Sequence, residues 1–316
     1  MRDVLIRRGV WALAAALALA FLLLGSGLDF DYVIPNRLLR LAAIVVAGVC
    51  IAVSALTFQT LTGNRILTPA IMGYEAIYLL LQSLLVMALG AQSLALLGRH
   101  GNALLSIAVM LAYSWAIHRA LFRKERKDLY LLLLTGLVLT MVLGTFTQFI
   151  QLKTSPGEFA ILQGFSYASF NRVQPGALLF AALLTAAAAW LVSRRLAVLD
   201  VLLLGREQAV SLGVDYPANV RAQLALIAVL VAVSTSLVGP TAFMGVFVAN
   251  ISYTLARTFR HRVTLPLACA IAIAIFIAAQ LLVEQLFNYK TTVSILVNLV
   301  CGAYFLALMV RSRGHA

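Results

Sequence analysis

Long apolar runs alternate with short polar segments along most of the chain. A helix needs about 20 mostly apolar residues to cross the hydrocarbon core of a bilayer. The polar borders of these runs predict ten membrane-spanning helices, near residues 10–28, 39–60, 74–97, 103–121, 129–150, 176–193, 219–238, 243–258, 264–286 and 292–310. The pattern thus predicts an all-α polytopic membrane protein with a single transmembrane domain over residues 1–316.

Composition supports this prediction. Of the 316 residues, 63% are hydrophobic and only 11% are charged, and the mean hydropathy is +0.99. Soluble domains have roughly 25% charged residues, and a soluble chain of this length could not bury so much apolar surface. The composition therefore excludes a soluble enzyme and a nucleic-acid-binding protein, although the net charge is +13.

The basic residues predict the orientation of the chain in the membrane. With ten spans and both termini in the cytoplasm, 18 of the 24 lysines and arginines lie inside. Basic residues accumulate on the cytoplasmic side of membrane proteins, so this split favours an even number of spans. The apolar run 10–28 could instead belong to a cleaved signal peptide, but its length favours a first span. The six basic residues left outside are Arg37, Arg40, Arg99, Lys153, Arg172 and Lys290.

The sequence contains no motif for a chemical or energetic step of its own. It has no phosphate-binding loop of the Gly-x-x-x-x-Gly-Lys-[Ser/Thr] type and no zinc-hydrolase or nucleophile-elbow motif. The three cysteines lie in apolar runs without a pairing pattern, which favours small buried side chains. Only two carboxylates fall within predicted spans, Glu75 and Glu284, both near span ends. We therefore expect neither an enzyme nor a metal or cofactor on this chain.

A segment predicted to be cytoplasmic, about 194–217, is too polar to span the membrane. The stretch LDVLLLGREQAVSLGVD within it predicts two short helices, broken at Gly205 and ended by Gly213. Arg206 and Glu207 are expected to be exposed, with Ala209, Val210 and Leu212 free for contact. Such a helix can dock in a groove of a soluble partner, or it can lie on the lipid surface.

Four segments in order, spread over the ten-span pattern, resemble the FecCD permease family of ATP-binding-cassette importers for iron–siderophores and cobalamin. They are NRLLR at 36–40, LTGNRILTPAIMG at 61–73, LGREQAVSLGV at 204–214 and VGPTAFMGVFV at 238–248. Departures from the family pattern include Ala249-Asn250 in place of Pro-His and Arg65 in place of a proline. Together with the segments 73–76 and 289–292, they resemble a sub-branch for catecholate or anguibactin-type siderophores.

The resemblance implies a type II importer architecture, partners and site residues. ATPase subunits would bind ATP and Mg²⁺ and drive the permease, a periplasmic or lipid-anchored binding protein would deliver ferric siderophore, and a second permease chain would complete the pathway, with a heterodimer favoured over a homodimer. The residues implied for ATPase coupling are Leu204, Gly205, Glu207, Ala209, Leu212 and Gly213. Those implied for binding-protein docking are Arg37, Arg40 and Lys290, and those for the pathway or gate are Gly239, Pro240, Asn250 and Asp128.

Two other classes stay open at this point. An ion-coupled secondary transporter of a small metabolite or drug would depend on Glu75 or Glu284, because intramembrane carboxylates are the usual carriers of coupling ions. A membrane scaffold without transport activity would bind partners but move no substrate.

Overall fold

A computed structural model describes residues 2–25, 27, 29–90, 93–122, 129–241 and 243–313, and every element in this part of the chain is helical. In chain order the elements are α1 (Arg2–Leu23), α2 (Val33–Thr62), η1 (Pro69–Met72), α3 (Tyr74–Leu89), α4 (Ser93–Phe122), α5 (Leu129–Gln151), α6 (Pro156–Ser166), η3 (Phe170–Arg172), α7 (Pro175–Ser193), α8 (Leu196–Leu202), α9 (Arg206–Ser211), α10 (Tyr216–Leu237), α11 (Met244–Ala256), α12 (His261–Leu281), the π-helical turn η4 (Leu282–Leu286) and α13 (Val293–Arg313).

The ten predicted spans all coincide with apolar helices. Within the described residues, six helices are long and apolar enough to cross a membrane, and four shorter apolar helices, in α3, α4, α11 and α13, account for the other predicted spans. Two boundaries differ from the prediction. α3 ends at Leu89 rather than near residue 97, because Gly90 adopts a positive φ and ends the helix. α4 already begins at Ser93, and Gly98 forms a kink inside it.

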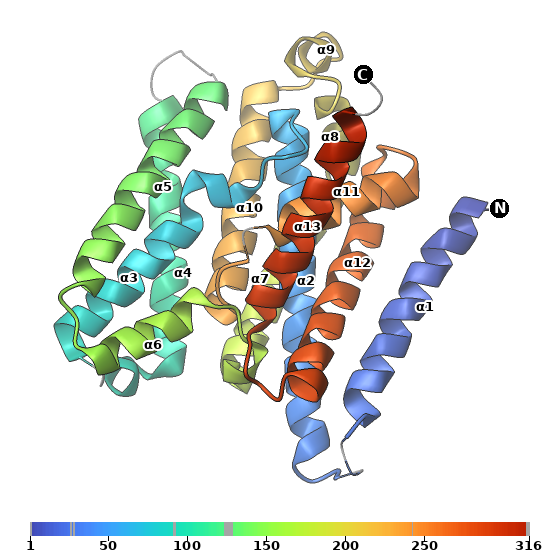
Figure 1. Ribbon diagram of the computed structural model, residues 1–316. Helices are drawn as coiled ribbons and strands as arrows, with labels where there is room; N and C mark the ends of the chain where they lie inside the picture. Colours follow the sequence, from blue (N-terminus) through green and yellow to red (C-terminus); the bar gives the residue numbers. More distant parts are fainter. Residues whose placement is uncertain are drawn as a thin grey trace.

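The centre of the bundle is formed by α2, α10 and α12, and α1 covers one side of α12 (Figure 1). In α2, 78% of the apolar stretch is buried, against 11% in α1. Small residues allow the central helices to approach closely. A Cβ atom on Gly48 of α2 would lie 2.9 Å from Ile273 Cγ1 of α12, so a larger residue there would push the two helices apart.

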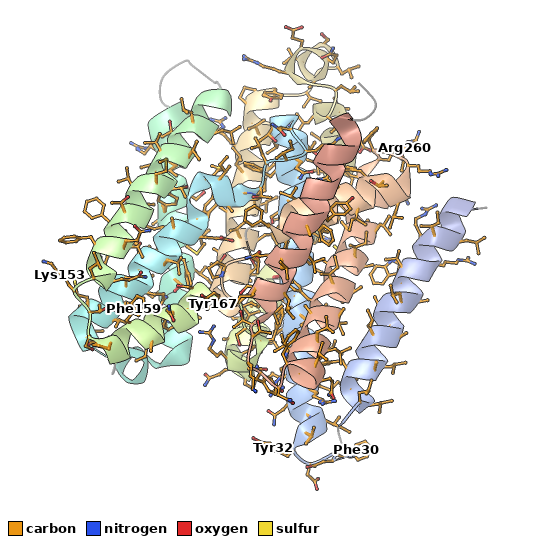
Figure 2. All side chains as sticks on the ribbon, viewed as in Figure 1. Phe30, Tyr32, Lys153, Phe159, Tyr167 and Arg260 are labelled. Carbon is orange, nitrogen blue, oxygen red and sulfur yellow. The ribbon has the colours of Figure 1, made fainter. Side chains whose placement is uncertain are left out.

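The two ends of the bundle carry different segments. Helices α8 and α9 lie at one end, while α6 and the turn with Phe30 and Tyr32 lie at the other (Figures 1 and 2). The start of α1 and the end of α13 both lie toward the α8–α9 end. We call this the inner end and the opposite one the outer end, in keeping with the orientation that the basic residues predict.

The outer polar segment 151–174 contains a helix that the sequence analysis treated only as a loop. Ser155 N-caps α6, and Glu158 accepts in return from the Ser155 backbone N–H at 3.0 Å. This capping box, Ser-x-x-Glu followed by apolar residues, was present in the sequence as a sign of a helix start. α6 lies across the outer end of the bundle (Figure 1).

Candidate functional site

The predicted coupling segment forms two short helices at the inner end. α8 covers Leu196–Leu202 and α9 covers Arg206–Ser211. Gly205 lies between them with φ +96°, and Gly213 follows α9 with φ +80°. Residues other than glycine rarely adopt such backbone angles, so both glycines are needed for this course of the backbone. The prediction of two helices, broken at Gly205 and ended near Gly213, is confirmed.

The coupling segment exposes an apolar surface with charges beside it. Leu204 is 56% exposed and Leu212 62%, and Glu207 is exposed as well. Ala209, however, has no exposed surface. Its methyl group packs inside the chain, so the expectation that Ala209 is accessible for contact is wrong. The small side chain instead lets α9 pack closely against its own protein.

Hydrogen-bond contacts between three side chains connect the coupling segment to the centre of the bundle. Asp200 of α8 accepts from the backbone N–H of His261 at 2.8 Å, and its Oδ1 also lies 2.6 Å from His261 Nδ1. On the other side of the ring, Nε2 of His261 lies 2.7 Å from Thr60 Oγ1 of α2. His261 is 1% exposed. The sequence analysis missed this connection, because the three residues are far apart in sequence and belong to no motif.

At the outer end, Glu284 gathers the two predicted docking arginines. Arg40 donates to Glu284 at 3.1 Å, and the Arg37 guanidinium lies 3.7 Å from the same carboxylate. Gln280 donates to Glu284 at 2.7 Å. One carboxylate thus faces two cations, which leaves the cluster with a net positive charge.

Arg37, implied by the family resemblance as a docking residue, is not exposed at the surface. Its side chain is 9% exposed, and its guanidinium donates to carbonyl groups at the end of α1, including that of Phe21 at 2.7 Å. Carbonyl groups of a last helical turn lack donors from their own helix, and the arginine supplies N–H donors to them. Arg40, with 26% of its side chain exposed, and the exposed Lys290 remain accessible. Arg40 also donates to the hydroxyl group of Tyr289, the neighbour of Lys290, at 3.3 Å.

Gly239 and Pro240 interrupt the chain between α10 and α11. Gly239 has φ +112°, and a Cβ atom there would lie 3.1 Å from the carbonyl oxygen of Tyr167. Two hydrogen bonds from residues distant in sequence stabilise the backbone at this interruption. The Val238 carbonyl accepts from the N–H of Ser169 at 2.9 Å, and the Glu75 carboxylate accepts from the N–H of Thr241 at 2.9 Å. Irregular backbone inside a membrane protein is tolerated where the protein satisfies its polar groups, as it does here.

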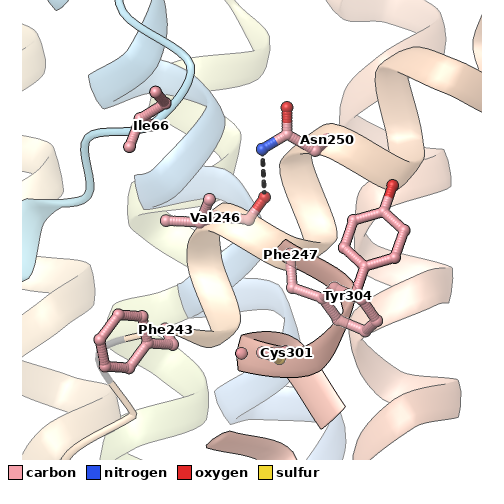
Figure 3. A pocket seen from close by; sticks show the side chains of 8 residues that line it. Ile66, Phe243, Val246, Phe247, Asn250, Cys301 and Tyr304 are labelled. Atoms are coloured by element: carbon pink, nitrogen blue, oxygen red, sulfur yellow. Dashed lines mark hydrogen bonds between the residues drawn. The ribbon is translucent and has the colours of Figure 1, made fainter. Parts of the chain in front are cut away.

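Asn250 of α11 lines an apolar pocket of about 120 Å³, shown in Figure 3 together with Phe243 and Tyr304. Its side-chain amide donates to the carbonyl groups of Val246, at 2.9 Å, and Arg65, at 3.2 Å. Asn250 therefore fixes the turn after α2 against α11. Asp128, the remaining gate candidate, lies outside the described residues. The coupling, docking and pathway candidates thus occupy three separate regions, the inner end, the outer end and the α10–α11 region.

Comparison with known proteins identifies the scaffold that carries these regions. The petrobactin import system permease YclO of Bacillus subtilis is 35% identical, over 90% of this chain and 90% of that protein. The petrobactin import system permease FatC of Bacillus anthracis is 33% identical, over 90% of this chain and 80% of that protein. A solved structure described as a metal-chelate type ABC transporter in an inward-facing conformation matches in fold, with a TM-score of 0.83 at 20% identity, over 97% of this chain and 99% of that one.

The profile of the FecCD transport family matches residues 9–311, nearly the whole chain. This match agrees with the four sequence segments and with the helical fold. The chain is thus a transport permease rather than an enzyme, and it belongs to the FecCD transport family.

Proposed function

We propose that this chain is a permease subunit of an ATP-binding-cassette importer that moves a ferric siderophore across the inner membrane of a bacterium. The match to the FecCD transport family over residues 9–311 carries this proposal. The similarity to two petrobactin permeases favours petrobactin or a related siderophore as the substrate, and the sub-branch resemblance favours a catecholate or anguibactin-type siderophore.

The coupling segment is the proposed contact with the ATPase subunits. Leu204 and Leu212 offer exposed apolar side chains, and Glu207 offers a charge. Asp200 of α8 contacts His261 of α12, which contacts Thr60 of α2. A displacement of α8 by the ATPase would therefore be transmitted directly to α12 and α2. ATP and Mg²⁺ would bind to the ATPase, and their hydrolysis would drive alternating access.

At the outer end, Arg40 and Lys290 are the proposed contacts for a siderophore-binding protein. Arg40 lies in α2 and Lys290 in the turn before α13, and the bond from Arg40 to the Tyr289 hydroxyl connects the two segments. The Glu284 carboxylate fixes Arg40 in place. Exposed charges of this kind orient a partner and raise its association rate more than its affinity.

A second permease chain is the proposed occupant of the exposed apolar face of α5. The exposed residues follow the spacing of one helix face and are Leu134, Leu137, Val138, Met141, Val142, Phe146 and Phe149. The sub-branch resemblance favours a second, different permease over a second copy of this chain.

The test is uptake of iron-55 as ferric petrobactin by cells that carry the tagged chain with its neighbouring transporter genes, compared with a Gly205→Trp variant. A bulky residue at φ +96° distorts the path between α8 and α9, so we expect ATP hydrolysis to continue while uptake is lost. Uptake at the wild-type rate would contradict the coupling role. Purification of the tagged chain in mild detergent should recover an ATPase and a second permease.

An ion-coupled carrier is the alternative function. It would transport without an ATPase and would stop on neutralisation of Glu75 or Glu284. Against it, Glu284 is paired with two arginines and Glu75 accepts from a backbone N–H, so both carboxylates have structural partners. Recovery of the chain without an ATPase, with uptake abolished by Glu75→Gln, would favour the carrier.

A further inference from the structure

Two cavities adjoin each other near the outer end, on the side of the bundle where α4 and α7 lie. One, the polar chamber, has a volume of about 290 Å³ and lies between α3, α4, α6 and η3. The other, the apolar chamber, has a volume of about 220 Å³ and lies between α4 and α7. The two share three lining residues, Ala103, Ser236 and Leu237, so they adjoin each other along these side chains.

The polar chamber offers a positive charge and hydrogen-bond donors. Arg172 lines it, with its guanidinium over the Phe165 ring at 5.7 Å and one N–H donating to the Tyr167 carbonyl at 2.8 Å. Tyr78 also lines it, is only 5% exposed, and its hydroxyl makes no hydrogen bond within the described residues. Asn102 lines the chamber as well, but its side-chain amide is paired with that of Gln82, to which it donates at 3.1 Å, so Arg172 and Tyr78 are the donors offered to a ligand. A cation together with neutral hydrogen-bond donors is a combination that binds phosphate or carboxylate groups.

The apolar chamber has a different lining and opens sideways. Ile107 of α4 and Ala181 of α7 form buried walls, while Leu104 is 50% and Phe180 40% exposed at its edge. An apolar cavity of about 150 Å³ already holds a benzene ring, so this chamber has room for part of an alkyl chain. Its exposed edge lies on helices that the topology places against the bilayer.

We propose that these adjoining chambers bind one anionic phospholipid of the outer leaflet, with the headgroup phosphate beside Arg172 and Tyr78 and part of an acyl chain between α4 and α7. A polar compartment with a cation, next to an apolar slot with exposed apolar edges, matches an anionic amphiphile rather than a small ion. The site shares no lining residue with the pocket between α11 and α13. Val238, which precedes the Gly239 break, lines the polar chamber, so the headgroup would brace the outer side of that break.

The test is native mass spectrometry of the full chain in mild detergent, titrated with phosphatidylglycerol or phosphatidylcholine. We expect the wild type to bind one phosphatidylglycerol in preference to phosphatidylcholine. Arg172→Gln removes the cation and should weaken that binding about tenfold, the effect of losing a charge-assisted hydrogen bond. Ala177→Phe puts a ring into the apolar chamber and should displace the lipid without changing any charge.

The matched control is Lys153→Gln, which removes a cation over an aromatic ring at the same end of the bundle but away from the chambers. It should bind lipid as the wild type does. Equal phosphatidylglycerol binding by wild type, Arg172→Gln and Ala177→Phe would overturn the proposal. If inorganic phosphate displaced phosphatidylglycerol as effectively as added lipid does, the proposal would also be overturned. The polar chamber would then be a site for a free anion.

Discussion

At the scale of single residues, burial separates two arginines that look equivalent in the sequence. Arg37 and Arg40 are one helical turn apart and both face Glu284, yet Arg37 also caps α1 through its carbonyl groups. Hydrogen bonding to the end of another helix cannot be inferred from the motif NRLLR. The first residue therefore stabilises the fold, while the second is accessible to a partner.

This difference predicts unequal losses of stability for two alanine variants. Arg37→Ala removes a buried partner of Glu284 and exposes unpaired carbonyls, so we expect a loss of about 3 kcal/mol in unfolding free energy. Arg40→Ala changes a partly exposed pair and should cost about 1 kcal/mol or less, while it slows association of the binding protein. Denaturation in detergent and association kinetics measure the two effects. Equal destabilisation by both variants would contradict this assignment.

The connection between Asp200, His261 and Thr60 gives a second prediction at this scale. His261→Ala removes the buried ring that joins Asp200 to Thr60, while Asp200 keeps the backbone N–H of residue 261. We therefore expect a loss of about 1 kcal/mol in stability together with reduced uptake per ATP hydrolysed. Arg260→Gln, at the exposed neighbouring residue, is the control and should leave both unchanged. Wild-type coupling in a folded His261→Ala protein would exclude a role of this connection in transmission.

At the scale of elements, glycines decide where helices end and how their ends pack. The sequence analysis correctly placed the break at Gly205 and the stop at Gly213, because glycine between short amphipathic runs is itself a local sign of a helix end. It could not show that Gly239 packs against Tyr167 and Ala168, since that contact joins segments about seventy residues apart.

Gly213 and Gly239 therefore form a matched pair. Gly213→Ala meets no atom within 4 Å, and only its φ of +80° opposes the change, so we expect a cost of about 1 kcal/mol. Gly239→Ala meets both a positive φ and the Tyr167 carbonyl at 3.1 Å, so the loss of stability should be clearly larger. Unfolding midpoints of the two variants compare them directly, and a Gly239→Ala protein as stable as Gly213→Ala would refute the close contact.

At the scale of the whole molecule, the distribution of basic residues predicts which end faces the cytoplasm. Leu212 lies in the coupling segment at the inner end, and Lys290 lies at the outer end. The native cysteines Cys50 and Cys301 are buried and Cys269 is half-buried, so they should react slowly. A membrane-impermeant maleimide should label Lys290→Cys in intact spheroplasts and Leu212→Cys only in inverted vesicles. The reverse pattern would overturn the orientation.

The sequence by itself determined the class of the protein, the ten apolar helices and the two-helix coupling segment. These follow from local properties, namely apolar length, helix-ending glycines and the charge of short loops, which act within one stretch of chain. Only the tertiary structure decided that Arg37 and Ala209 are buried, that His261 joins α8 to α2, and that Arg172 lies beside a slot between α4 and α7. Those outcomes depend on which helices pack together, because burial and pairing arise from contacts between residues that are distant in sequence.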